Sequence, residues 1–209
     1  MGAVTVIDYG VGNLFSLTSS LRYIGAECKI SSDFDEILAA ELVILPGVGA
    51  FGDAVEQLRA SGLVPAIMEL AARGTPLLGI CVGMQLLFEE SLEFGRHEGL
   101  GLLRGSISPL DVDIAAAGFS LKVPQMGWNK LRVLSRDCPI LSRSSNNEFF
   151  YFVHSYYAKG CEGSVAADVE YGINVPSVVS KGNVHGTQFH PEKSGSAGLD
   201  ILRAFCEHK

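Results

Sequence analysis

Residues 75–88 read TPLLGICVGMQLLF and place one cysteine, Cys81, between an apolar run and a helical pattern. The apolar run is typical of a buried strand, and the pattern that follows indicates a helix continuing to Glu90. Gly79 and Gly83 flank the cysteine. Glycines are needed where a tight turn leaves no room for a Cβ atom or requires unusual φ and ψ angles. The stretch therefore predicts a strand–turn–helix elbow that presents the Cys81 thiol.

A cysteine at the first turn of a helix is favoured as a thiolate, because a helix N-terminus carries a partial positive charge. The alternative for Cys81 is a small buried core residue, as free cysteines often are. The flanking glycines favour the reactive thiol over the core residue.

Composition limits the kinds of protein that this chain can be. The 209 residues are 47% hydrophobic and 19% charged, with a net charge of −7, which predicts one folded domain over residues 1–209. The negative charge argues against nucleic-acid and anionic-membrane binding. The first residues lack a basic signal-peptide region, and no apolar run approaches the ~18 residues of a membrane span.

The five cysteines are scattered, and none forms a CxxC pair. This pattern argues against a disulfide framework and a zinc cluster. It fits a reducing compartment. We therefore expect a cytoplasmic protein without a metal or cofactor.

The first half of the chain alternates between strand and helix patterns. Strands are expected at 3–8, 26–30 and 41–45 and before Cys81, with helices between them. This order predicts an α/β fold with a mostly parallel, doubly wound sheet flanked by helices.

After Gly95 strand-like segments replace helices, which predicts an antiparallel β extension from the C-terminal half. These segments are residues 102–107, 119–123, 127–134, 148–158, 165–171, 177–180 and 183–189, and a helix over 199–206 closes the chain.

A glycine-rich loop, residues 46–53 (PGVGAFGD), follows the strand at 41–45. Ligands of doubly wound sheets bind at the carboxyl ends of the strands, so this loop and Cys81 belong to one edge. The N–H groups of Val48 or Gly49 and of Val82 are candidates for an oxyanion hole. An ordinary turn is the alternative. Asp53 is expected to cap the next helix.

A cysteine nucleophile needs a base, and the base needs an orienting group. His190 precedes Pro191 and is therefore extended. Residues i and i+2 of an extended chain share a face, so Glu192 is expected beside the His190 ring. We predict a Cys81–His190–Glu192 triad, with a surface His–Glu pair as the alternative. The remaining histidines are His97, His154, His185 and His208.

Gln85 follows Cys81 by one helical turn, so the two side chains are expected on one side of the helix. Its primary amide suits a small polar substrate. A glutamine on the helix surface is the alternative.

Residues 79–85 (GICVGMQ) and 190–192 (HPE) resemble the class I (triad) glutamine amidotransferases, whose fold is flavodoxin-like. Within them the chain resembles the glutaminase subunits of imidazole glycerol phosphate synthase. That resemblance rests on residues 8–14 (DYGVGNL), 46–52 (PGVGAFG), 124–129 (PQMGWN) and 151–156 (YFVHSY). It covers residues 3–206. One departure is Gln125, where many members have histidine, and it is expected to affect only the interface.

The resemblance implies hydrolysis of L-glutamine to L-glutamate and ammonia through a thioester on Cys81. It implies that Gln85 and the main chain around His154, Ser155 and Tyr156 bind the amino-acid end of glutamine. It also implies a heterodimer with a barrel-shaped cyclase subunit that uses the ammonia in histidine biosynthesis. Candidates for the face toward that partner are Asn13, Met126, Trp128, Asn129, Tyr151 and Lys193; for Trp128, core packing is the alternative.

We expect the glycine-rich loop to be a switch that completes the oxyanion hole only when the cyclase is loaded. The reasons are its glycines and the lack of an ammonia-acceptor site in this chain. Three alternatives remain open: a glutaminase of another pathway, a stand-alone γ-glutamyl hydrolase, and a binding subunit without activity in which Cys81 is core.

Overall fold

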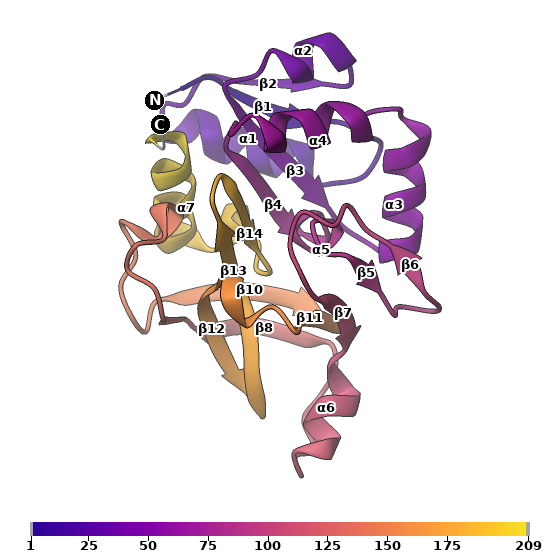
Figure 1. The fold of residues 1–209 in the computed structure, drawn as a ribbon. Coiled ribbons are helices and arrows are strands. Elements are labelled where there is room, and N and C mark those ends of the chain that lie inside the picture. The colour runs from indigo at the N-terminus through magenta and orange to yellow at the C-terminus, as the bar shows by residue number, and fades with distance from the viewer. Residues whose placement is uncertain (1, 208–209) are drawn as a thin grey trace.

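The computed structural model describes residues 2–207, and Figure 1 shows their arrangement. Strands and helices alternate through the first half. The strands are β1 (Val4–Ile7), β2 (Cys28–Ser31), β3 (Leu42–Gly47) and β4 (Leu77–Cys81). The helices are α1 (Leu14–Tyr23), α2 (Phe34–Leu38), α3 (Phe51–Ala60), α4 (Val64–Ala72) and α5 (Val82–Leu86).

The chain after α5 is mainly strands. They are β5 (Glu90–Ser91), β6 (His97–Glu98), β7 (Ser106–Pro109), β8 (Gln125–Lys130), β9 (Arg132–Val133), β10 (Phe149–His154), β11 (Tyr156–Lys159), β12 (Val165–Tyr171), β13 (Ile173–Lys181) and β14 (Val184–Thr187). The helices are α6 (Leu110–Ala116), α7 (Gly195–Glu207) and the short 3₁₀ turns η1 (Pro139–Leu141), η2 (Glu162–Ser164) and η3 (Pro191–Lys193).

An eight-stranded sheet with the order β2-β1-β3-β4-β14-β13-β12-β9 forms the centre of the molecule. The first five of these strands are parallel, in the flavodoxin-like order, with β14 in the fifth place. β13, β12 and β9 continue the sheet with antiparallel pairing. The predicted parallel sheet with an antiparallel extension is confirmed.

Two smaller sheets flank the large one: an antiparallel pair, β10-β8, and a four-stranded sheet, β11-β7-β5-β6. Both come from residues 90–159, and Figure 1 shows the β10-β8 pair crossing below the parallel strands.

The core is apolar on both faces of the parallel strands, because helices cover both. Every residue of β1, β3 and β4 is buried. A cluster of three fully buried rings joins β10 to the end of β14: the centroid of Phe189 lies 4.2 Å from that of Phe150 and 5.6 Å from that of Phe152. Burial of each such side chain contributes roughly 1.5–3 kcal/mol. The cluster fixes the backbone directly before His190.

Several predicted elements differ from the observed ones. The helix after Cys81 ends at Leu86 and does not reach Glu90, which belongs to β5. The segment 148–158 is two strands in different sheets, which separate at Ser155. Residues 119–123 form no strand: the Phe119 N–H closes α6 by donating to the Ile114 carbonyl. Helix α2 lies between the strands expected at 26–30 and 41–45, as the alternation predicts, whereas helix α6 was not predicted.

No helix within residues 2–207 is long and apolar enough to cross a membrane.

Candidate active site

Cys81 lies at the elbow between β4 and α5, as the sequence predicts. Its backbone angles are φ 55° and ψ −112°, a region that non-glycine residues rarely adopt. Such a conformation costs on the order of 1–3 kcal/mol and persists only where the surrounding structure imposes it.

The glycines around the elbow allow two strands and a helix to approach closely. A Cβ atom on Gly83 would lie 1.9 Å from the Leu45 carbonyl oxygen, and one on Gly79 would lie 2.6 Å from the Gly83 carbonyl oxygen. A Cβ atom on Gly47 would lie 2.5 Å from the Gly83 nitrogen. The glycines are therefore required for space, and the left-handed φ belongs to Cys81 itself.

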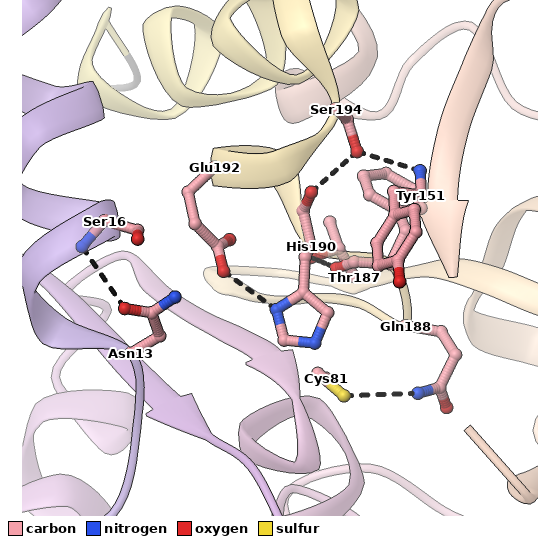
Figure 2. Close-up of polar contacts among 10 residues, drawn as sticks. Asn13, Ser16, Cys81, Tyr151, Thr187, Gln188, His190, Glu192 and Ser194 are labelled. Carbon is pink, nitrogen blue, oxygen red and sulfur yellow. Dashed lines mark hydrogen bonds and ion pairs between the residues drawn. The ribbon is translucent and has the colours of Figure 1, made fainter. Parts of the chain in front are cut away.

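His190 and Glu192 form the predicted pair. The His190 Nδ1 lies 2.8 Å from the Glu192 Oε1, and each side chain is only 3% exposed. In Figure 2 the Cys81 sulfur lies beside the ring edge that faces away from Glu192. The surface-pair alternative is therefore wrong. His190 is extended as predicted, but Pro191 begins η3, so the pair forms across a turn and not along a strand.

The backbone of His190 is anchored on both sides. Its N–H donates to the Tyr151 carbonyl at 3.1 Å, and its carbonyl accepts from the Ser194 hydroxyl at 2.6 Å. The Ser194 Oγ also accepts from the Tyr151 N–H at 3.0 Å, as Figure 2 shows. These bonds connect the end of β14 to β10 and α7 and hold the imidazole in place.

Two buried histidines near the pocket differ in charge. Burial acts to lower the pKa of His190, but hydrogen bonds with Cys81 and Glu192 outweigh it and raise this pKa to about 10. Burial lowers the pKa of His154 to about 4, against a raising contribution from its Nδ1 contact with the Tyr156 carbonyl at 2.9 Å. At neutral pH His190 is protonated and His154 is neutral. Of these two histidines, only His190 therefore carries a proton that it can donate at neutral pH.

A pocket of about 300 Å³ opens above the thiol, a size that suits a small polar ligand. Its lining brings together the predicted oxyanion and substrate-binding residues. The lining residues are Val48, Gly49, Cys81, Val82, Gln85, Glu93, Val153, His154, Ser155, Tyr156, His190 and Lys193.

Gln85 is only 3% exposed, so the alternative of a surface glutamine is wrong. Its amide nitrogen donates to the Tyr156 carbonyl and to the Gln188 Oε1, both at 3.1 Å. Because both donors are used inside the protein, the carbonyl oxygen is the polar atom that Gln85 can offer a ligand.

Glu93 is a pocket residue that the sequence analysis missed, and it is the one carboxylate among the described lining residues. Burial raises its pKa, against the lowering effect of a hydrogen bond from the Phe51 N–H. This hydrogen bond, 2.6 Å from the Phe51 nitrogen to the Glu93 Oε2, satisfies the N–H group of the first residue of α3. The prediction that Asp53 caps this helix is wrong, since Asp53 lies within its first turn. No sequence pattern separates Glu93 from the acidic residues near it.

The residues predicted to face a partner are at least partly exposed. Met126 and Trp128 on β8 are 62% and 54% exposed, so core packing of Trp128 is wrong. The Trp128 ring meets the Tyr151 ring edge-on, with centroids 6.1 Å apart. Lys193 is exposed, and Asn13 and Asn129 are partly buried. Gln125 is fully buried opposite His154, so its side chain is not part of the exposed face, and its expected effect on the interface stays a prediction.

Within residues 2–207, no group of three or more His, Cys, Asp or Glu side chains is arranged to hold a metal ion. His208 lies outside the described residues.

The sequence matches the family Glutamine amidotransferase class-I over residues 5–208. The chain belongs to this family and is a glutamine amidotransferase.

The chain is 53% identical to the imidazole glycerol phosphate synthase subunit HisH of Bacillus licheniformis, over 97% of this chain and 94% of that protein. It is 46% identical to the HisH subunit of Caldanaerobacter subterraneus subsp. tengcongensis, over 98% of this chain and 97% of that protein.

Solved structures show the same fold at lower identity. The crystal structure of a glutamine amidotransferase superposes with a TM-score of 0.75 at 22% identity and covers 99% of this chain and 98% of that one. The PurLQS structure from Thermotoga maritima gives a TM-score of 0.73 at 22% identity and covers 98% of both chains.

Proposed function

We propose that this chain hydrolyses L-glutamine to L-glutamate and ammonia in the pocket above Cys81, and that it does so as a single domain in the cytoplasm. The observation that carries the proposal is the buried pair of His190 and Glu192, 2.8 Å apart, beside a strained cysteine at the pocket floor. Membership of the class-I family supports the same reaction.

In the first half of the reaction, the Cys81 thiolate attacks the carboxamide carbon of glutamine. The protonated imidazole of His190 balances the thiolate charge, and Glu192 holds the ring in its orientation. The negative charge on the tetrahedral oxygen is stabilised by the N–H of Val82 and by that of Val48 or Gly49.

Collapse of this intermediate breaks the C–N bond, and the His190 imidazolium donates its proton to the leaving nitrogen, which departs as ammonia. The γ-glutamyl thioester remains on Cys81. Neutral His190 then removes a proton from water, which attacks the thioester carbon and releases glutamate and the thiolate. No cofactor takes part in these steps.

The amino-acid end of glutamine is held by Gln85 and by the main chain around His154, Ser155 and Tyr156. Glu93 adds a negative charge on the same pocket wall, which suits the α-ammonium group. Glu93→Gln keeps an oxygen for the Phe51 N–H and removes the charge. We expect KM for glutamine to rise by about tenfold with kcat little changed. An unchanged KM would exclude the contact.

The ammonia passes to a cyclase subunit that makes imidazole glycerol phosphate in histidine biosynthesis. The support is the identity of 53% with a protein named as a subunit of that synthase. The proposed partner face contains Asn13, Met126, Trp128, Asn129, Tyr151 and Lys193. Its exposed Trp128 and Met126 are apolar, as buried interface centres are. Trp128→Ala should weaken co-purification with the cyclase without changing the fold.

The glycine-rich loop is proposed to complete the oxyanion hole when the loaded cyclase binds. Gly49 has a φ of +87°, and Val48 is 38% exposed, so packing leaves room for the peptide groups to turn. Glutaminase turnover should be slow for the chain alone and rise strongly with cyclase and its ligand. Equal turnover in both conditions would exclude the switch.

The reaction is tested with an electrophilic glutamine analogue and with two substrates. The analogue should label Cys81 and should not label the Cys81→Ala variant, which should also lose glutaminase activity. Glutamine should be hydrolysed faster than a γ-glutamyl peptide. A preference for the peptide would favour a stand-alone γ-glutamyl hydrolase, and full activity of Cys81→Ala would exclude the proposal.

A further inference from the structure

The second carboxylate oxygen of Glu192 lies in an unusual environment. The Oε1 atom bonds to His190, but the Oε2 atom is buried and has no hydrogen-bond partner among the described residues. A buried carboxylate oxygen without a donor is costly, and structures normally supply one from the protein or from an ordered water.

A small pocket is lined by Glu192 and Asn13. It has a volume of about 10 Å³, close to the space that one water molecule requires. Leu17, Pro46 and Ile80 contribute apolar side chains to its wall, and Asn13 lies on the wall with Glu192. The cavity therefore has few groups that could donate a hydrogen bond to the Oε2 atom.

Asn13 offers the missing donor. Its side-chain oxygen caps α1 by accepting from the Ser16 N–H at 3.3 Å. That bond assigns the amide orientation, since only the oxygen can accept, and it leaves both N–H donors of the nitrogen for other partners. In Figure 2 this nitrogen lies on the side of Asn13 that faces Glu192.

We propose that Asn13 is a positioning residue of the triad, with one water molecule bridging its amide nitrogen to the Glu192 Oε2. The inference rests on the proposed function, because it assigns Asn13 a role through Glu192 and His190. With both oxygens accepting hydrogen bonds, the carboxylate keeps its rotamer and its position beside the His190 ring. A residue that holds the hydrogen-bond partner of a functional histidine also fixes the orientation of the histidine ring.

Glu192 is the buried charge on which the Cys81–His190 pair depends. Tyr9, whose pKa burial raises, and His154, whose pKa burial lowers to about 4, lie close to the pair, and both are uncharged near neutral pH. Glu93 lines the same pocket, where the Phe51 N–H donates to its Oε2 atom. Lys193 borders the pocket but is exposed to solvent. A change in the hydrogen bonding of Glu192 should therefore change the reactivity of the Cys81 thiol.

The test measures alkylation of Cys81 by iodoacetamide in the isolated full-length chain, followed by mass spectrometry from mildly acidic to alkaline pH. Asn13→Asp keeps the capping oxygen and replaces the donor with a second oxygen that repels Glu192. We expect alkylation at neutral pH to slow by about tenfold and the pH profile to shift. Asn13→Ser, which keeps a capping oxygen but cannot reach the water, should slow it less. Because the partner is absent, a role of Asn13 at an interface cannot contribute.

Asp33→Ala is the matched control, because the Asp33 side chain caps α2 by accepting from the Glu36 N–H at 2.9 Å. This variant should lose a helix cap and alkylate like the wild type. Unchanged alkylation of Asn13→Asp, or equal slowing in Asp33→Ala, would overturn the proposal. Failure of wild-type Cys81 to react at all would instead overturn the proposed function, so the two outcomes are distinguishable.

Discussion

The elbow at Cys81 and the glycine-rich loop beside it both depend on glycine, but for opposite reasons. At the elbow, a Cβ atom on Gly79 or Gly83 would lie within 2.6 Å of backbone atoms. In the loop, a Cβ atom on Gly49 would meet nothing within 4 Å, and the residue is glycine because of its φ of +87°. Packing therefore fixes the nucleophile and Gly47 at the start of the loop, whereas Gly49, a candidate for the second oxyanion donor, has no such close packing.

The largest expected effect concerns the packing of the elbow. Gly83→Ala places a methyl group 1.9 Å from the Leu45 carbonyl oxygen, so β3 or α5 must move. We expect the free energy of unfolding to fall by about 3 kcal/mol or more, measured by urea denaturation. Gly62→Ala, with a φ of +74° and open space, is the control and should lose only about 1–2 kcal/mol. Equal losses would contradict the close packing.

The next effect concerns the charge held at the elbow. The His190 pKa is raised from its ordinary value of 6.5 to about 10, so the stability that this residue contributes is fully present below pH 6.5. It is lost as the pH rises toward 10. Glu192→Gln removes one raising interaction, so the His190 pKa should fall, its contribution to stability should be smaller, and the loss should be complete at a lower pH.

Unfolding free energies of wild type and Glu192→Gln, measured across this pH range, check the prediction. NMR titration of the His190 ring provides a direct control. Identical pH profiles in the two proteins would show that Glu192 does not hold the charge on His190.

A smaller effect is expected in the loop. Gly49→Ala should cost about 1–2 kcal/mol of stability, like Gly62→Ala, because both have a positive φ and open space. Only Gly49→Ala should also lower glutaminase turnover, by about tenfold, because it disturbs a proposed oxyanion donor. Equal turnover in the two variants would remove the loop from the catalytic machinery.

The smallest expected effect concerns the backbone strain at Cys81. Cys81→Gly and Cys81→Ala should both lack glutaminase activity, but the glycine variant relieves the φ of 55°. We expect Cys81→Gly to be the more stable of the two by about 1 kcal/mol, measured by thermal unfolding. Greater stability of Cys81→Ala would show that the cysteine backbone is not strained.

The elbow and the triad could be predicted because their signals are local. Cys81 has its glycines in the same short stretch, and Glu192 is tied to His190 across one proline. Helix α2 also had a local signal, since Asp33 caps the helix at Glu36, and α6 had acidic residues in its first turn and an apolar i, i+4 pair. Of these two, α2 was expected from the alternation of strands and helices, and α6 was missed although its pattern was present.

Other features depend on contacts that sequence spacing does not reveal. Residues 119–123 alternate between apolar and polar side chains, as a strand does, but Phe119 and Leu121 lie against Gly172 without strand pairing. Glu93 reaches the pocket because β5 and β6 bring it to the start of α3. The cavity between Asn13 and Glu192 likewise exists only once α1 packs against η3.

The most direct test of the central claim is to quench the working enzyme with acid during turnover of isotopically labelled glutamine and to locate the label by mass spectrometry. We expect a γ-glutamyl group on the peptide that contains Cys81, and none on the other four of the five cysteines. A label on another cysteine, or turnover that persists in Cys81→Ala, would contradict the claim.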